Sequence, residues 1–196
     1  MIYYTQLFFE KHVALSSDNK KIKFLHKKAN NNLIKRIQNL NLISAGSTIE
    51  YPIEALKFLE VISKKINKFK GGLLTFDYGY NTKKNKNTLQ SVKKHKQLDV
   101  FFKPGTSDIT SHINFKLFNK VLIKNNLEVK KITEQSEFLK KIGILQRADI
   151  LSKKMTFKEK ANMFYRLKRL LDSREMGSLF KVMFAQKKGV NFTLGF

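Results

Sequence analysis

The stretch GGLLTFDYGY, residues 71–80, places a carboxylate and a phenol at the end of an apolar run. The run favours a buried strand, and Asp77, Tyr78 and Gly79 close it. In an open parallel sheet, ligands bind beyond the carboxyl ends of the strands, where loops and helix starts converge. Asp77 and Tyr78 could therefore orient a substrate at that edge. The alternative is that Asp77 ends the strand as an ordinary turn or cap residue.

Other side chains capable of chemistry are few. The histidines are His12, His26, His95 and His112, and no two of them have the spacing of metal ligands. The chain has no cysteine, which excludes disulfides and cysteine-based zinc sites, so we predict no metal. His95 in a basic loop and His112 near a helix start could each hydrogen-bond a substrate or cap a helix. Neither a nucleophile elbow nor a Walker-type glycine loop is present.

The elements that must position these residues follow from periodicity and turn residues. Residues 4–15 and 21–26 flank the turn SSDN and predict a β-hairpin. Pro52 and apolar residues at positions 53, 56, 59, 62 and 66 predict an amphipathic helix that glycines 71 and 72 stop. The remaining expectations are a short helix within 32–40, a loop over 81–97, a short apolar piece at 99–105, a helix developing within 106–126, a strand at 127–135, a short helix at 136–144, a long helix at 156–173 and a last strand at 179–187. This order predicts the α/β class, with a helix feeding a parallel strand, in one domain over residues 1–196.

Charge is the strongest compositional signal. The 196 residues contain 39 Lys and Arg against 15 Asp and Glu, a net charge of +24. Such an excess is compatible with nucleic acid or an anionic membrane as partner, or with a lysine-rich solvated surface. The basic residues are mostly lysine and scattered, without the aromatic or arginine ladder that stacks bases, so nucleic-acid binding is not favoured. No apolar run approaches the ~20 residues of a membrane span.

Several short motifs, taken in order, resemble the MidA-like family of S-adenosylmethionine-dependent methyltransferases. They are GGLLTFDYGY, NTLQSVKKHK, PGTSDITSHINF, EQSEFLKKIGILQR and MGSLFKVMFAQ, and the resemblance covers nearly the whole chain. The resemblance rests on the order and spacing of these motifs, because no single motif is specific to the family. The positions that match are Asp77, Tyr78, Gly79, Thr88, Leu89, Gln90, His95, Pro104, Gly105, Asp108, Thr110, His112, Phe115, Gln135, Phe138, Leu139, Gly143, Ile144 and Arg147.

The resemblance implies a partial Rossmann-like methyltransferase sheet with flanking helices and a β-hairpin insertion. It implies S-adenosylmethionine as cofactor and a protein-arginine substrate in assembly of respiratory complex I, in the mitochondrial matrix of a eukaryote or the cytoplasm of a bacterium. Asp77, Tyr78 and Asp108 would orient the guanidinium, with Gly79, Gln90, His95 and His112 binding substrate. Carboxylates suit this role because they form charge-assisted hydrogen bonds with guanidinium.

Two departures from the family pattern bear on function. Asn114 stands where the family usually has Asp. The glycine-rich turn that follows the first strand of such enzymes and approaches the cofactor is not in this sequence, so no cofactor-binding residue is assigned. We therefore expect a C-terminal portion lacking the N-terminal cofactor-binding strands, the missing half being encoded elsewhere or lost. The alternative function is a non-catalytic basic module that binds a protein or nucleic acid.

Overall fold

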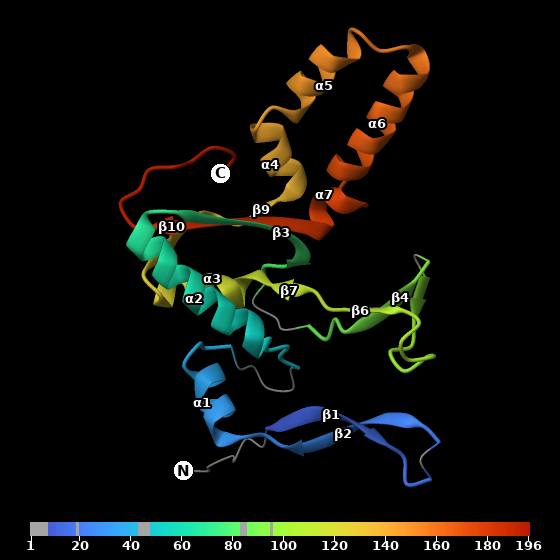
Figure 1. The fold of residues 1–196 in the computed structure, drawn as a ribbon, viewed down its shortest axis with the longest axis vertical. Coiled ribbons are helices and arrows are strands. Elements are labelled where there is room, and N and C mark those ends of the chain that lie inside the picture. The colour runs from blue at the N-terminus through green and yellow to red at the C-terminus, as the bar shows by residue number, and fades with distance from the viewer. Residues whose placement is uncertain (1–7, 19, 43–47, 83–85, 95) are drawn as a thin grey trace. The chain divides into compact units, whose positions relative to one another are not determined.

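A computed structural model describes residues 8–18, 20–42, 48–82, 86–94 and 96–196 of the chain. They form two compact units that interleave along the sequence (Figure 1). The first unit takes residues 1–49 and 85–111, and the second takes residues 50–84 and 112–196. A single domain over residues 1–196 stays a prediction.

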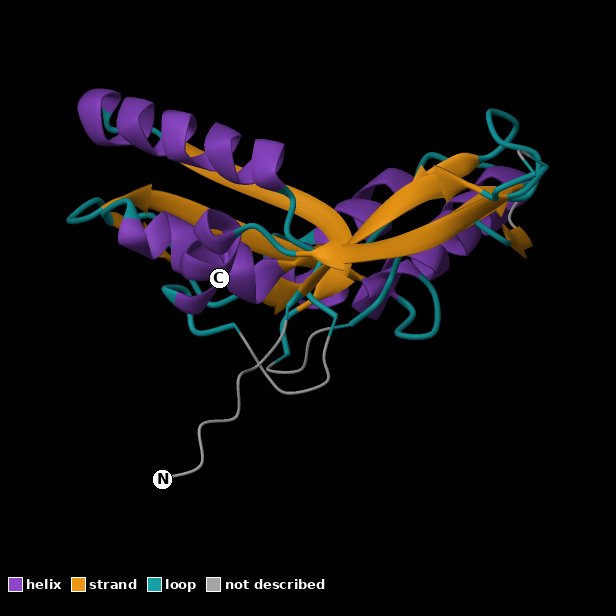
Figure 2. Ribbon diagram, turned by 90° about the horizontal axis from the view of Figure 1, so that it is seen from below, coloured by secondary structure: helices purple, strands orange, loops and turns teal. Residues whose placement is uncertain are grey.

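In the first unit the predicted hairpin is present. Strands β1 (Phe9–Leu15) and β2 (Ile22–Lys28) pair antiparallel through seven consecutive residues and form a twisted two-stranded ribbon (Figure 2). Helix α1 (Asn31–Gln38) follows, as the sequence predicted. The Asn30 side chain caps it by accepting a hydrogen bond from the Asn32 backbone N–H at 2.8 Å.

The first unit also holds a three-stranded sheet that the sequence did not predict. Strands β4 (Gln90–Lys93), β5 (Lys96–Leu98) and β6 (Asp108–Thr110) pair antiparallel in the order β5-β4-β6. The loop prediction for residues 81–97 is therefore wrong, because β4 and most of β5 lie in it. These strands are only three or four residues long and mostly polar, so they lack the alternation of apolar residues that reveals a strand. The segment 106–126 becomes helical only from Phe115, because β6 precedes the helix. The apolar piece at 99–105 forms turns, and its Phe101 ring lies 4.6 Å from that of Phe24.

The second unit is built on a mixed sheet. Its strands run in the order β7-β3-β10-β8, and β9 also pairs with β10. Strand β3 pairs parallel with β7 but antiparallel with β10, which is antiparallel to β8 as well. The α/β class is confirmed, whereas the expectation of a parallel sheet holds only for the short β3–β7 pair. The strands are β3 (Gly72–Tyr80), β7 (Ile113–Asn114), β8 (Leu127–Val129), β9 (Thr133–Glu134) and β10 (Phe180–Lys187).

Helices flank this sheet on both faces. Helices α2 (Ile53–Phe69) and α3 (Phe115–Lys124) lie on one face and α4 (Gln135–Lys141) on the other (Figure 1). The predicted spacing places Leu56, Leu59 and Ile66 of α2 in the core, as expected. Helix α2 ends at Phe69, and its C-cap Lys70 has a left-handed backbone (φ 59°) that stops the helix one residue before the glycines that the sequence predicts as its stop.

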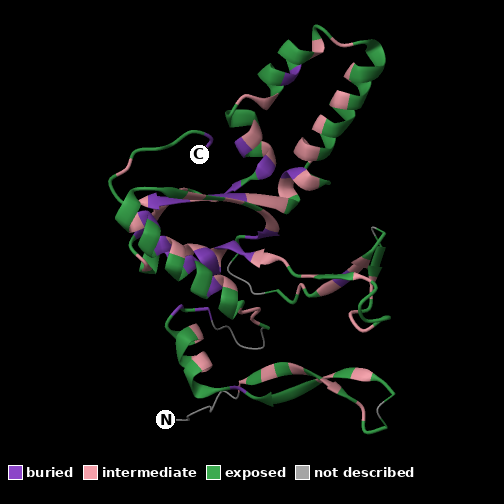
Figure 3. Cartoon of the chain, in the orientation of Figure 1, coloured by how far each residue is buried: buried purple, intermediate pink, exposed green. Residues whose placement is uncertain are grey.

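A helical arm extends from α4. It comprises α5 (Ile144–Ser152), α6 (Phe157–Leu171) and the short α7 (Met176–Leu179). The sequence predicted one short helix over 136–144, but α4 ends at Lys141, and Gly143 with φ +87° starts α5. Thr156 and Glu159 form a capping box at the start of α6, and the Thr156 backbone N–H lowers the pKa of the Glu159 carboxyl. None of the residues of α6 is fully buried (Figure 3).

Aromatic rings cover part of the sheet face on the α4 side. The Phe138 ring of α4 lies 5.1 Å from Phe76 of β3 and 5.1 Å from Phe196. Phe196 in turn stacks on Phe184 of β10 at 5.7 Å. Strand β3 is nevertheless not buried on both faces as predicted, because Leu74 and Phe76 remain 49% and 41% exposed. The ring contacts hold the C-terminal segment against the sheet, but they leave part of this sheet face exposed to solvent.

Gly79 lets β3 approach β7 closely. A Cβ atom at this position would lie 2.3 Å from the Ile113 carbonyl oxygen and 2.8 Å from the Phe115 ring. The oxygen belongs to backbone and cannot move aside as a flexible side chain could. The glycine of the Asp-Tyr-Gly motif therefore has a packing reason that does not depend on any ligand.

We predict that Gly79→Ala lowers the free energy of unfolding by about 1–3 kcal/mol, because the added methyl group must push β7 and Phe115 away. Gly71→Ala is the matched control, since nothing lies within 4 Å of a Cβ built there. Urea unfolding followed by circular dichroism measures both. If the two variants have equal free energies of unfolding, β7 can move away from the added methyl group without a loss of stability.

Candidate functional site

Asp77 and Tyr78 project from opposite faces of β3. They are consecutive residues of a regularly paired strand, in which Asp77 stands opposite Lys181 and Tyr78 opposite Phe180. Both side chains are half-buried. The Asp77 carboxylate accepts a hydrogen bond from the Tyr78 backbone N–H at 2.8 Å, which holds it close to the strand. The acid and the phenol therefore cannot both act on one side of the sheet.

On the face of Tyr78, the structure brings two of the expected residues together. The Tyr78 ring lies 5.5 Å from the His112 ring, edge to face, and 5.8 Å from the Phe180 ring. His112 comes just before β7, which is parallel to β3 and carries His112 to the same end of the sheet. Tyr78 and His112 thus form a mixed aromatic and polar surface at the carboxyl end of β3.

On the face of Asp77, three charged residues stand side by side on neighbouring strands. Lys181 of β10 is opposite both Asp77 of β3 and Glu134 of β9 in the strand registers. Its Nζ lies 3.1 Å from Glu134 Oε1 and also donates to the Ser178 carbonyl. The ammonium is therefore engaged on the Glu134 side. Sequence analysis did not find Lys181 or Glu134, because only strand register reveals that they neighbour Asp77.

The other expected site residues belong to the first unit. Gln90 donates from Nε2 to Thr110 Oγ1 at 3.2 Å, across the β4–β6 pair in which these residues are opposite each other. Asp108 begins β6 and is exposed. His95 lies outside the described residues. Gln90 and Asp108 thus share one small sheet, while Asp77, Tyr78, Gly79 and His112 belong to the second unit.

Asn114, the departure from the family pattern, caps α3. Its buried Oδ1 accepts a hydrogen bond from the Leu117 backbone N–H at 3.1 Å. Asn and Asp are about equally good at this position, because each offers an oxygen to an otherwise unpaired N–H. The substitution of Asn for Asp therefore preserves the cap.

The described residues do not form a cofactor-binding turn. Such a turn places glycines between a strand and the N-terminus of a helix. Among the described glycines, Gly72 and Gly79 lie within β3, Gly71 leads into that strand, Gly177 lies within α7, and Gly143 joins two helices. Gly105, Gly189 and Gly195 have positive φ but are not followed directly by a helix.

Two further findings concern the described part of the chain. No group of three or more His, Cys, Asp or Glu side chains there could hold a metal ion. None of its helices combines the length and apolar character needed to cross a bilayer.

Residues 2–133 match the family described as "Putative S-adenosyl-L-methionine-dependent methyltransferase". Among curated relatives, the mitochondrial protein arginine methyltransferase NDUFAF7 homolog of Caenorhabditis elegans is 32% identical over 104 residues, which are 53% of this chain and 24% of the relative. The mitochondrial protein arginine methyltransferase NDUFAF7 of Xenopus tropicalis is 27% identical over 134 residues, 68% of this chain and 31% of the relative.

Two crystal structures of proteins from Burkholderia thailandensis share the fold. One, bound to S-adenosyl-homocysteine, aligns with a TM-score of 0.76 at 22% identity over 97% of this chain and 50% of that protein. The other, an uncharacterized protein, aligns with a TM-score of 0.75 over 95% of this chain and 50% of its own length. The chain thus spans half of each solved structure and less than a third of these curated relatives.

The chain belongs to this MidA-like family of S-adenosylmethionine-dependent methyltransferases, because the family match covers most of its length. The α/β fold expected from the resemblance is confirmed by the solved structures. Whether N-terminal strands are missing stays a prediction.

We predict that Asn114→Ala lowers the free energy of unfolding by ~1 kcal/mol, because the Leu117 N–H loses its acceptor. Asn114→Asp should cost less, since the carboxylate restores the acceptor. Thermal unfolding compares the two with Asn162→Ala, which removes an exposed amide from α6 of the same unit. A loss as large with Asp as with Ala would contradict a capping role.

Proposed function

We propose that this chain supplies the substrate-binding part of an S-adenosylmethionine-dependent methyltransferase that acts on protein arginine. The family match over residues 2–133 carries the proposal, because it includes the Asp77 strand end, Gln90, Asp108 and His112. The curated relatives bear the name of protein arginine methyltransferase, which supports the substrate class. The cofactor would be held by parts of the enzyme outside the matched segment.

Asp77 is the residue best suited to a guanidinium. A carboxylate can accept paired hydrogen bonds from the planar guanidinium fork, which fixes its orientation. Lys181, opposite Asp77, is paired with Glu134, so its ammonium is directed toward another carboxylate. Among the described residues, the Asp77 carboxylate accepts from the Tyr78 N–H through one oxygen, so its other oxygen can accept from a substrate. Orienting the guanidinium in this way is how positioning lowers a reaction barrier.

Tyr78 and His112 would act on the other face of the strand, where their rings meet. There they can shape the wall against which a bound peptide or a neighbouring part of the enzyme packs. Asp108 and Gln90, on the sheet of the first unit, are proposed to contact the substrate protein as well. His95 keeps the same proposed role, although it lies outside the described residues.

The proposed biological setting is assembly of respiratory complex I, with a subunit of that complex as the protein substrate. The relatives' names place them in mitochondria, which supports the mitochondrial matrix for a eukaryotic source. A bacterial source would place the reaction in the cytoplasm.

A second candidate is a non-catalytic binding module derived from the same fold. The net charge of +24 favours it, because so basic a chain attracts acidic protein surfaces or nucleic acid without any catalysis. The two candidates differ in whether methyl transfer appears when the rest of the enzyme is supplied.

We predict that the isolated chain binds S-adenosylmethionine weakly or not at all, because its described residues form no cofactor-binding turn. Isothermal titration calorimetry measures this directly. A dissociation constant in the micromolar range or tighter would overturn the assignment of this chain to the substrate side.

We predict that Asp77→Asn reduces methyl transfer by about ten-fold or more, the equivalent of ~1.4 kcal/mol of transition-state stabilisation. The amide oxygen of Asn can still accept the Tyr78 N–H, so the strand end is preserved and only the charge is lost. Transfer to an arginine peptide is measured after adding the portion of the Xenopus tropicalis relative that lies outside the matched region.

Asp149→Asn is the control, because it removes the same charge from α5. It should leave methyl transfer unchanged. In the reconstituted enzyme, the affinity for S-adenosylmethionine should be unaffected in both variants. If Asp77→Asn transfers methyl groups at the original rate, Asp77 is a strand-end residue and not a substrate ligand.

A further inference from the structure

The helical arm contains a cavity that the proposed methyltransferase function does not use. Side chains of α5 and α6, and of the turn between them, line a space of about 510 Å³. Its apolar wall is formed by Ala148, Leu151, Met155, Met163, Leu167 and Leu170. We call this space the α5–α6 groove. In Figure 1 the two helices form the two sides of the arm.

The α6 helix is under-packed for its length. It runs for 15 residues without one fully buried side chain, although Met163, Leu167 and Leu170 face the groove half-buried (Figure 3). Most of the stability of a helix in a protein comes from burying an apolar face. The capping box stabilises the start of α6 but does not replace this burial. Another apolar surface seated in the groove would complete that burial.

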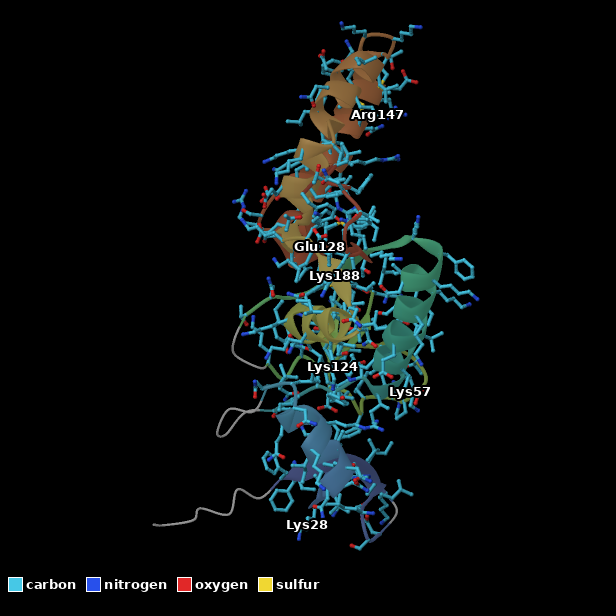
Figure 4. The ribbon with its side chains drawn as sticks, turned by 90° about the vertical axis from the view of Figure 1, so that its left-hand side faces the viewer. Lys28, Lys57, Lys124, Glu128, Arg147 and Lys188 are labelled. Atoms are coloured by element: carbon cyan, nitrogen blue, oxygen red, sulfur yellow. The ribbon has the colours of Figure 1, made fainter. Side chains whose placement is uncertain are left out.

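The positive charge of the two helices indicates that a partner of the groove would be negatively charged. Residues 144–171 carry eight Lys and Arg against two acids, Asp149 and Glu159. Arg147 from α5, labelled in Figure 4, and Arg166 from α6 both line the groove. In the described part of the chain neither arginine takes part in an ion pair, whereas Glu159 is engaged by its own cap at Thr156. The groove therefore offers two guanidinium groups beside an apolar wall.

We propose that the α5–α6 groove binds an acidic amphipathic helix of a partner protein. An amphipathic helix laid between two helices presents apolar residues at intervals of three and four to the groove and keeps its acids at the rim. Arginine pairs well with carboxylates at such a rim, and Met155 and Met163 can adapt their shape to the incoming side chains.

Two other occupants fit less well. A second copy of this chain would bring two basic arms together, and like charges at an interface oppose association. An anionic bilayer would take up an apolar face that points outward along one helix, whereas the apolar wall here lies between two helices. The proposal does not depend on methyl transfer, and it can be tested by binding alone.

The probe is a fluorescein-labelled helical peptide of about 18 residues, with Leu at intervals of three and four and Glu elsewhere. Fluorescence anisotropy with the full chain should give saturable binding that weakens as salt is added. The same peptide with Lys in place of Glu should not bind. Absence of saturable binding by the Glu peptide, or equal binding of both peptides, would overturn the proposal.

Matched variants separate the groove from the general basic charge of the chain. Leu167→Ala and Arg166→Glu, both in the groove, should weaken Glu-peptide binding by about five-fold or more. Phe164→Ala and Lys158→Glu also remove an apolar side chain and reverse a positive charge on α6, but outside the groove, and should change binding by less than about two-fold. Circular dichroism checks that all four variants stay folded. Equal losses within each matched pair would show nonspecific attraction and refute the groove.

Two further measurements address the other occupants. Sedimentation velocity over a range of concentrations tests for a second copy. If the wild type forms a dimer and Leu167→Ala abolishes it, the occupant of the groove is a second copy of the chain. We expect no such dimer. Vesicles of phosphatidylcholine and phosphatidylserine should bind wild type and Leu167→Ala equally. Loss of vesicle binding in that variant would identify a lipid surface instead.

Discussion

The pairing of β3 with β10 is the interaction on which the second unit depends. Seven consecutive residue pairs join residues 72–78 to residues 180–186. Strand β10 also pairs with β8 and β9, and its Val182, Met183 and Ala185 are completely buried. Helices α2 and α3 on one face and α4 on the other cover this pair, so the apolar contacts that they make with the sheet form only once the pair exists. The register of the same pair decides which residues neighbour Asp77.

Strand alternation divides the Asp-Tyr-Gly motif into three separate tasks. Asp77 faces the side of Lys181, Tyr78 faces the side of His112 and Phe180, and Gly79 admits the backbone of β7. A motif that reads as one cluster in the sequence therefore serves two surfaces and a packing contact. Gln135 is similar, because its buried side chain donates to the Leu170 carbonyl at 3.0 Å and ties α4 to the end of α6. Positions that mark a family can thus be structural.

Periodicity predicted the elements whose apolar residues face one side. Helix α2 and β10 were found with bounds close to those observed, because each has a regular apolar pattern. The β1–β2 hairpin was also found, but β1 begins at Phe9, and residues 4–7 of the predicted strand lie outside the described residues. The β4–β5–β6 sheet was missed, since backbone hydrogen bonds and not apolar side chains define it. The division at Gly143 was missed because apolar residues continue across it. Within the candidate site, Asp77 and His112 could be named from the sequence, but Lys181 and Glu134 required the strand registers.

The distance in sequence between β3 and its partner has a consequence during synthesis. About a hundred residues separate the two strands, so β3 leaves the ribosome long before β10 exists. At typical translation rates the delay is on the order of 10 seconds, far longer than a strand needs to find a neighbour. For that interval the backbone of β3 is an open template bearing Leu74 and Phe76. Until β10 has been made, this unpaired strand edge is exposed to the non-native association to which such edges are prone.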